Sequence, residues 1–110
     1  MNDREWGFKT RAIHAGGGPD VSTGARNVPI YQTTSFVFED TRDAADMFAL
    51  QKFGSIYTRI SNPTINAFEE RMASLEGGIG SVATSSGMSA EFLTAAALAS
   101  TGDSFVTSSA

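Results

Sequence analysis

Apolar positions recur at helical spacing in the middle of the chain. Steps of three and four residues place them on one face of a helix, and they are Ile65, Phe68, Met72 and Leu75. Asn62 is a good N-cap residue and Pro63 suits the first helical position, while Gly77-Gly78 stops a helix. The pattern predicts a helix that begins at Pro63 and turns this apolar face inward, with Glu69-Glu70 on the solvent side.

A second helical pattern precedes this one. Thr41 can cap a helix from Arg42 to about Phe53, and Gly54 can stop it. Its inward stripe would consist of Ala44, Ala45, Met47 and Phe48.

Extended patterns occur on both sides of the helices. Residues 30–38 are rich in β-branched and aromatic side chains. After residue 80 the order is a short apolar run at 81–84, a glycine turn, a helix over about 88–100, a break at 101–103 and a second extended run. This order predicts a right-handed β-α-β unit of a parallel sheet. Because the run over 103–110 looks like a strand that has only begun, we expect the chain to be part of a longer protein.

The beginning of the chain has a different character. Residues 1–29 show neither helical nor strand periodicity, and they contain turn-forming clusters of glycine, proline and aspartate. A segment without its own core must lie on the rest of the protein or on another subunit. We therefore divide the chain into an extended arm, 1–40, and the incomplete start of a larger domain, 41–110.

Composition and charge exclude several functions. The chain has 110 residues, of which 41% are hydrophobic and 18% charged, which is typical of a globular protein. The net charge of −4, with 8 scattered basic residues, argues against nucleic-acid binding. Its apolar runs are far shorter than the ~20 residues of a membrane span. The lack of cysteine and of a secretory signal pattern fits a cytoplasmic protein. The single His14 lacks a metal-ligand motif, so we expect a structural role.

The glycine turn offers a place for an anion. The first amides of the helix after Ser85-Ser86-Gly87-Met88 have no partner within that helix, and the helix dipole favours negative charge there. Gly87 lets the backbone approach an anion closely. Since no GxxxxGKS or GxGxxG pattern occurs, a single phosphomonoester is the better candidate. The alternative is that Ser86 simply caps the helix.

A second candidate lies between the two predicted helices. Tyr57 and Arg59 are two residues apart, so an extended backbone would point both side chains to one face. A phenol and a guanidinium can donate to one anionic group. The alternative is an exposed arginine that packs on a surface tyrosine.

The sequence resembles the Cys/Met-metabolism family of pyridoxal-phosphate enzymes, whose members include cystathionine γ-synthase, cystathionine and methionine γ-lyases and homoserine sulfhydrylases. The resemblance covers nearly the whole chain, and its main motifs are Phe8-Lys9-Thr10-Arg11-Ala12-Ile13-His14-Ala15-Gly16, Pro29-Ile30-Tyr31-Gln32-Thr33-Thr34-Ser35-Phe36, Gly54-Ser55-Ile56-Tyr57-Thr58-Arg59-Ile60-Ser61-Asn62-Pro63-Thr64, Leu75-Glu76-Gly77-Gly78 and Ser85-Ser86-Gly87-Met88. Three motifs most resemble the O-acetylhomoserine sulfhydrylase branch, namely Ala25-Arg26, Gln32-Thr33-Thr34-Ser35-Phe36-Val37-Phe38 and Leu50-Gln51-Lys52-Phe53-Gly54.

The resemblance implies a fold, a cofactor and roles for residues. The fold would be α/β: the N-terminal part of a fold-type I, aspartate-aminotransferase-like transferase with an extended arm, two helices and the first β-α-β of a mostly parallel sheet. The cofactor would be pyridoxal 5′-phosphate. Gly87 and Met88, with Ser86 close by, would hold its phosphate in their own subunit. Tyr57 and Arg59 would reach the cofactor of the neighbouring subunit, in a dimer or a dimer of dimers.

The implied activity belongs to methionine and cysteine biosynthesis: O-acetylhomoserine plus sulfide (or a thiol) would give homocysteine and acetate by γ-replacement. Cystathionine γ-synthase and the γ-lyases share all of these motifs and stay open. The family's Schiff-base lysine lies beyond Ala110, and neither Lys9 nor Lys52 matches it, so we expect no catalytic residue in this chain. Two other functions also stay open. The chain could be a non-catalytic fragment that binds phosphate and forms oligomers, or an unrelated small α/β protein that binds phosphate.

Overall fold

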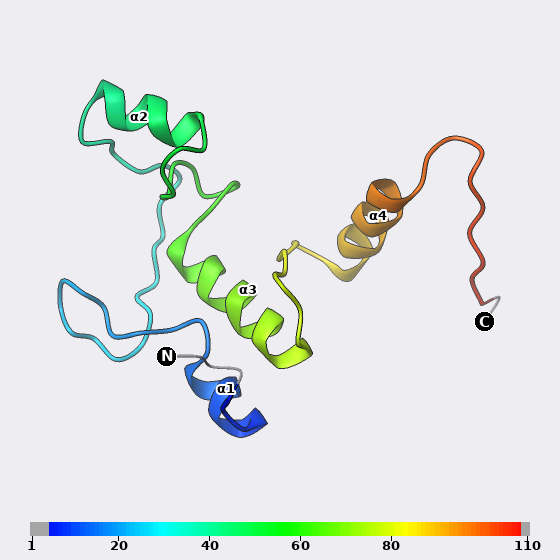
Figure 1. Ribbon diagram of the computed structural model, residues 1–110, viewed down its shortest axis with the longest axis horizontal. Helices are drawn as coiled ribbons and strands as arrows, with labels where there is room; N and C mark the ends of the chain where they lie inside the picture. The colour runs from blue at the N-terminus through cyan, green and yellow to red at the C-terminus, as the bar shows by residue number, and fades with distance from the viewer. Residues whose placement is uncertain (1–4, 109–110) are drawn as a thin grey trace.

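The computed structural model describes residues 5–108, in which four helices are joined by long irregular segments (Figure 1). The helices are α1 (Phe8–His14), α2 (Thr41–Phe48), α3 (Pro63–Glu76) and α4 (Gly87–Leu98). The first residues of the predicted arm, 1–4, and the end of the predicted last strand, 109–110, lie outside the described residues.

Helix α3 is bounded by the residues that the sequence indicates. The Asn62 side chain accepts a hydrogen bond from the Thr64 amide, and Pro63 occupies the first turn. Gly77 ends the helix in the left-handed region at φ 72°, where glycine is favoured. Both predicted ends of this helix are confirmed.

The buried face of α3 is not the predicted one. Small residues form it, namely Ala67, Ala73 and Ser74. Ile65 and Phe68, from the predicted inward stripe, are 36% and 55% exposed. The prediction was wrong because α1 packs on the small-residue side of α3, and the spacing of apolar residues along α3 carries no information about that contact.

Helix α1 was not predicted from the sequence, and its contact with α3 places that part of the arm on its own chain (Figure 1). An Arg11 guanidinium nitrogen donates to the Ser74 carbonyl, and Arg71 Nε donates to the Ala15 carbonyl at 2.8 Å. Gly16 has φ 67°, and a Cβ there would overlap the Ala67 carbonyl oxygen. The two helices are therefore held by reciprocal arginine–carbonyl bonds and by a turn that requires glycine.

Helix α2 is shorter than predicted, and its cap is a different residue. Asp40, not Thr41, accepts the Asp43 amide, and the Asp43 carboxylate accepts the Glu39 amide in return. The helix ends at Phe48 rather than near Phe53. The pattern of two aspartates three residues apart resembles a capping box and was available in the sequence. Phe48, which belongs to the predicted inward stripe, is exposed. The buried residue of this helix is Asp43, which lies outside that stripe.

No strand is assigned in the part of the chain that the structure describes, where the predicted run over 30–38 contributes one antiparallel bridge, from Ser35 to Tyr57. Residues 81–84 and 104–108 follow the predicted order around α4 but pair with nothing as strands. A strand is defined by ladder bonds to a neighbour, and the segment over 81–84 meets α3 instead of a second strand.

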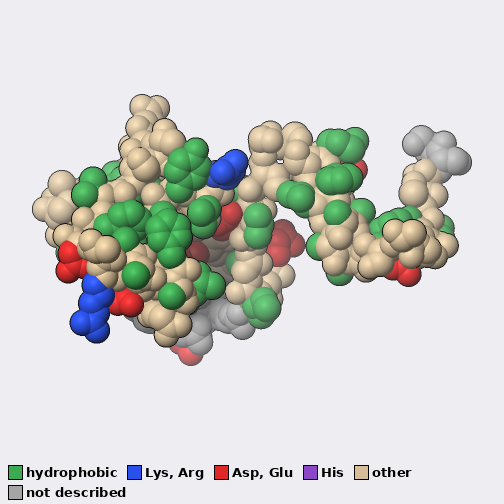
Figure 2. Space-filling model, turned by 90° about the horizontal axis from the view of Figure 1, so that it is seen from above, with side chains coloured by type: hydrophobic (Ala, Val, Ile, Leu, Met, Phe, Trp, Pro, Cys, Tyr) green, Lys and Arg blue, Asp and Glu red, His purple; other side chains and the backbone are tan. Residues whose placement is uncertain are grey.

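The described chain is elongated. Its radius of gyration is 17.5 Å, whereas a compact domain of about 100 residues has about 13 Å. Helix α4 and the segment after it extend away from the part that contains α1 to α3 (Figures 1 and 2). Residues of α4 are exposed on several faces, including Phe92 and Leu98. Within residues 5–108, every helix is too short or too polar to cross a lipid bilayer.

Candidate functional site

The backbone at Tyr57 brings the two predicted phosphate ligands together. Tyr57 lies in the bridge to Ser35, and the chain then turns, with the Ile60 and Ser61 amides donating to the Tyr57 carbonyl. The Arg59 guanidinium carbon lies 5.4 Å from the centre of the Tyr57 ring. The expectation of a fully extended segment was wrong, because a turn follows Tyr57. The two side chains are nevertheless neighbours.

Hydrogen bonds to the arm hold the backbone before and after Tyr57. The Thr58 amide donates to the Thr34 carbonyl at 2.8 Å, and the Phe36 amide donates to the Ile56 carbonyl at 3.1 Å. The Thr58 hydroxyl donates to the Thr33 carbonyl. These bonds fix the backbone from which the Tyr57 and Arg59 side chains extend.

Tyr57 and Arg59 line a cavity of about 470 Å³ between the arm, the start of α3 and the segment before α4. Thr33 and Thr34 contribute from the arm, and Ala83 contributes from the segment before α4. Ser86, Gly87 and Met88 do not line this cavity. The predicted site residues thus form two separate groups within one chain.

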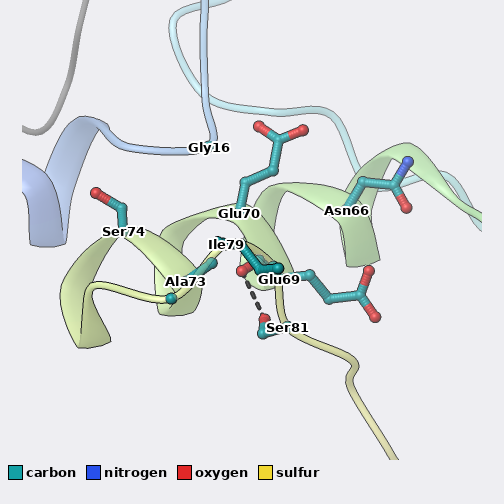
Figure 3. A pocket seen from close by; sticks show the side chains of 10 residues that line it. Gly16, Asn66, Glu69, Glu70, Ala73, Ser74, Ile79 and Ser81 are labelled. Atoms are coloured by element: carbon teal, nitrogen blue, oxygen red, sulfur yellow. Dashed lines mark hydrogen bonds between the residues drawn. The ribbon is translucent and has the colours of Figure 1, made fainter.

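Glu69 fastens the segment before α4 to α3. The Ser81 hydroxyl donates to the Glu69 carbonyl at 2.6 Å (Figure 3), and the Ala83 amide donates to Glu69 Oε1 at 2.7 Å. The prediction that Glu69 faces solvent was wrong, whereas Glu70 is exposed. Helical periodicity could not reveal this role, because the partners of Glu69 lie 12 and 14 residues further along the chain.

The start of α4 carries two backbone amides, Gly87 and Met88, that are without a partner within residues 5–108. Ser86 Oγ accepts from the Ser89 amide at 3.1 Å, which confirms that Ser86 caps the helix. The Gly87 and Met88 amides have no acceptor among the described residues. A Cβ built on Gly87 meets nothing within 4 Å, so the backbone at Gly87 is open on that side. Two bare amides at the positive end of a helix fit a phosphate group.

Neither lysine lies in the cavity. Lys9 is on α1, and Lys52 Nζ is 2.5 Å from the Asp43 carboxylate, whose side chain is 8% exposed. The hydrogen bond from Lys52 lowers the pKa of Asp43, and the same bond raises the pKa of Lys52. Lys52 is therefore protonated and paired, which makes it a poor nucleophile.

His14 has a structural environment. Its ring meets the Trp6 ring edge-on at 6.3 Å, and an Arg26 guanidinium nitrogen lies 2.5 Å from His14 Nδ1. Among residues 5–108, no three histidine or carboxylate side chains gather as they would around a metal ion.

The amino-acid sequence is similar to those of a known enzyme family. The model of the family described as Cys/Met metabolism PLP-dependent enzyme matches residues 9–110. The O-acetyl-L-homoserine sulfhydrylase of Corynebacterium glutamicum is 51% identical over 107 residues, which cover 97% of this chain and 24% of that protein. The chain therefore spans about a quarter of the length of this relative.

Solved structures agree with the sequence relatives. A crystal structure described as an O-acetylhomoserine (thiol)-lyase of Campylobacter jejuni, which contains a pyridoxyl-lysine phosphate, matches 89% of this chain and 24% of its own with a TM-score of 0.83 and 41% identity. The cystathionine γ-lyase of Lactobacillus plantarum matches 89% of this chain and 23% of its own, with a TM-score of 0.70 and 36% identity.

These neighbours confirm the predicted fold class, the N-terminal region of a fold-type I α/β enzyme. The family match likewise confirms pyridoxal phosphate as the cofactor of the group. With residues 9–110 matched by its model, the chain belongs to the Cys/Met-metabolism family of pyridoxal-phosphate-dependent enzymes.

Proposed function

We propose that this chain is the N-terminal part of an O-acetylhomoserine sulfhydrylase. The complete enzyme would convert O-acetylhomoserine and hydrosulfide to homocysteine and acetate, so that a carbon–sulfur bond replaces the carbon–oxygen bond at the γ-carbon. The observation that carries this proposal is the 51% identity with the Corynebacterium sulfhydrylase across 97% of the chain. The activity would belong to methionine biosynthesis in the cytoplasm.

The residues of this chain would bind the cofactor rather than carry out proton transfer. Pyridoxal phosphate, when bound, supplies an electron sink for the substrate's carbanion. The Gly87 and Met88 amides would donate to its phosphate, with Ser86 holding the helix start in place. Tyr57 and Arg59 would add a phenol and a guanidinium to the same anion. A phosphate of about −2 charge suits a helix N-terminus combined with one guanidinium.

The two groups would meet across a subunit boundary. Support for this comes from the cavity beside Tyr57 and Arg59, which Gly87 and Met88 do not line. One chain's Tyr57 and Arg59 would then complete the site that begins at Gly87 and Met88 of its neighbour. This arrangement requires a dimer or a dimer of dimers, and it would bring Thr33 and Thr34 of the arm, which line the cavity, close to the partner.

The 110-residue chain on its own would be inactive. Its Lys52 is paired with Asp43, and its Lys9 lies on α1, away from the cavity. The general acid–base lysine would have to come from the remaining three quarters of the enzyme.

The activity is tested with full-length protein, pyridoxal phosphate, O-acetylhomoserine and sulfide. Homocysteine and acetate in equal amounts are expected. Product with cysteine as acceptor but none with sulfide would identify a cystathionine γ-synthase instead. Ammonia and a 2-keto acid, formed without any sulfur acceptor, would identify a γ-lyase.

A further inference from the structure

Asn62 is the largest fully buried side chain in the described part of the protein, at 2% exposed, and its orientation is fixed by its neighbours. Its Oδ1 accepts from the Thr64 amide at 2.9 Å, which is the cap of α3. A backbone amide can only donate, so the other end of the Asn62 side chain must be the NH₂ group. That group donates to the Tyr31 carbonyl at 2.9 Å and to Thr58 Oγ1 at 3.1 Å.

The bond to Thr58 reaches the segment that carries Tyr57 and Arg59. Thr58 Oγ1 uses its single proton on the Thr33 carbonyl, so it can only accept from Asn62. The two hydrogen bonds therefore run in series, from the Asn62 side-chain amide to the Thr58 hydroxyl and from that hydroxyl to the Thr33 carbonyl of the arm. Because Thr58 lies between Tyr57 and Arg59 in the sequence, these bonds fix the backbone from which both side chains extend.

The bond to Tyr31 is reinforced by the next side chain of α3. Thr64 Oγ1 accepts from the Tyr31 amide and donates to the Pro29 carbonyl, both at 2.9 Å. The start of α3 therefore holds the arm at Pro29 and Tyr31 while it also holds Thr58. The Asn62 side chain bonds to the arm at Tyr31, to the Tyr57–Arg59 segment at Thr58 and to the start of α3 at Thr64.

We propose that Asn62 is a positioning residue for the phosphate ligands Tyr57 and Arg59. Its two N–H donors lock the Tyr57–Arg59 segment and the arm to the start of α3, and so hold the phenol and guanidinium ready for the cofactor phosphate. This inference rests on the proposed function for the effect on the cofactor, but the positioning itself is a property of the protein without cofactor.

The sharpest variant is Asn62→Asp in the full-length protein. Aspartate caps a helix as well as asparagine does, so α3 keeps its start. The two donors are lost, and a carboxylate oxygen faces the Tyr31 carbonyl and a Thr58 hydroxyl whose proton is already used. Asn66→Asp measures the effect of the added charge, because Asn66 lines the same cavity, and aspartate keeps the side-chain oxygen that accepts from the Asn62 amide at 3.4 Å.

Two measurements separate positioning from simple destabilisation. In the apoprotein, hydrogen–deuterium exchange of a peptide covering 56–61 should accelerate in Asn62→Asp, while peptides from the middle of α3 exchange at the wild-type rate. In the holoprotein, affinity for pyridoxal phosphate should fall about tenfold, which is the effect of losing one or two hydrogen bonds. Asn66→Asp should leave exchange over 56–61 at the wild-type rate, and any fall in its affinity measures the effect of charge alone, which the fall in Asn62→Asp should exceed.

The double variant shows whether Asn62 acts through Arg59. If it does, Asn62→Asp weakens cofactor affinity much less in an Arg59→Ala background than in the wild type. Fully additive losses would overturn the positioning role, and so would unchanged exchange over 56–61 in Asn62→Asp. If Arg59→Ala itself leaves affinity unchanged, the proposed phosphate contact is wrong, and the exchange result then decides the role of Asn62 by itself.

Discussion

The Arg59 guanidinium carbon lies 5.4 Å from the centre of the Tyr57 ring, and the guanidinium has no hydrogen-bond acceptor or carboxylate partner among the described residues. A cation over an aromatic face is oriented by the ring without using its N–H donors. Arg59 therefore combines a defined position with five free donors. That combination suits a residue whose acceptor is an anion from another molecule.

Arg59→Ala should weaken pyridoxal phosphate binding roughly 10- to 100-fold in the full-length enzyme, as expected for a charge-assisted hydrogen bond. Arg59→Lys should recover only part of this loss, because an ammonium group lacks the planar fork of a guanidinium. Equilibrium titration of the apoenzyme with cofactor measures both. Equal affinities for wild type and Arg59→Ala would contradict the role given to Arg59.

Gly87→Glu should fold normally and yet lose cofactor. A Cβ at Gly87 meets nothing within 4 Å, and acidic residues are favoured in the first turn of a helix. The added carboxylate would stand where the phosphate belongs, and affinity should fall about tenfold or more through like-charge repulsion. Gly18→Glu, at a glycine with equally open surroundings, is the control that should retain cofactor. Retention by both variants would exclude the α4 start as the phosphate site.

Gly16→Ala should loosen α1 from α3. The substitution combines a positive φ with a Cβ that overlaps the Ala67 carbonyl oxygen and lies 2.9 Å from the Arg71 amide nitrogen. A destabilisation of about 1–3 kcal/mol is expected for such backbone strain. Gly24→Ala is a matched control, because Gly24 has a similar φ of 71° with nothing within 4 Å of its Cβ. Thermal unfolding should show a larger loss for Gly16→Ala, and equal losses would mean that the close approach to α3 is unimportant.

The Asp43–Lys52 pair should make stability depend on pH in the acid range. The hydrogen bond from Lys52 lowers the pKa of Asp43 below its ordinary 3.8, so the folded state favours the carboxylate. This stabilisation is complete above pH 3.8 and is lost as the pH falls through the lowered value. Asp43→Asn should therefore lower Tm at pH 7 and approach the wild type in acid.

The control for this pair is Asp46→Asn, on the same helix but outside the ion pair. It should have little effect on Tm at either pH. Asp20, whose pKa is lowered to about 2 chiefly by a hydrogen bond from Ser22, should leave some acid dependence in every variant. A constant difference in Tm between wild type and Asp43→Asn across the acid range would contradict the assignment.

Local signals in the sequence explain what could be predicted of the fold. Asn62, Pro63 and Gly77 act on their own helix, so the ends of α3 follow from them. The cap of α4 at Ser86 is local in the same sense. The structure also brings Tyr57 and Arg59 together as predicted, although through a turn rather than an extended run.

The features that were missed depend on partners far away in the sequence. Helix α1 is only 7 residues long, which is too short to be stable by itself. The residues that hold it, Ser74 and Arg71, lie more than 50 residues further along the chain. The roles of Asn62 toward Tyr31 and of Glu69 toward Ala83 are likewise non-local. Periodicity describes one element at a time, so it could not supply these contacts.

The central claim is that one phosphate is bound by Gly87 and Met88 of one chain and by Arg59 of another. Its most direct test mixes full-length Arg59→Ala with full-length Gly87→Glu, allows the subunits to exchange, and measures bound pyridoxal phosphate per chain. If each site is shared between two chains, hybrid dimers contain one intact site, and about one site in four should recover wild-type affinity after random exchange. Cofactor binding equal to the mean of the two separate variants, with no recovery, would contradict the account.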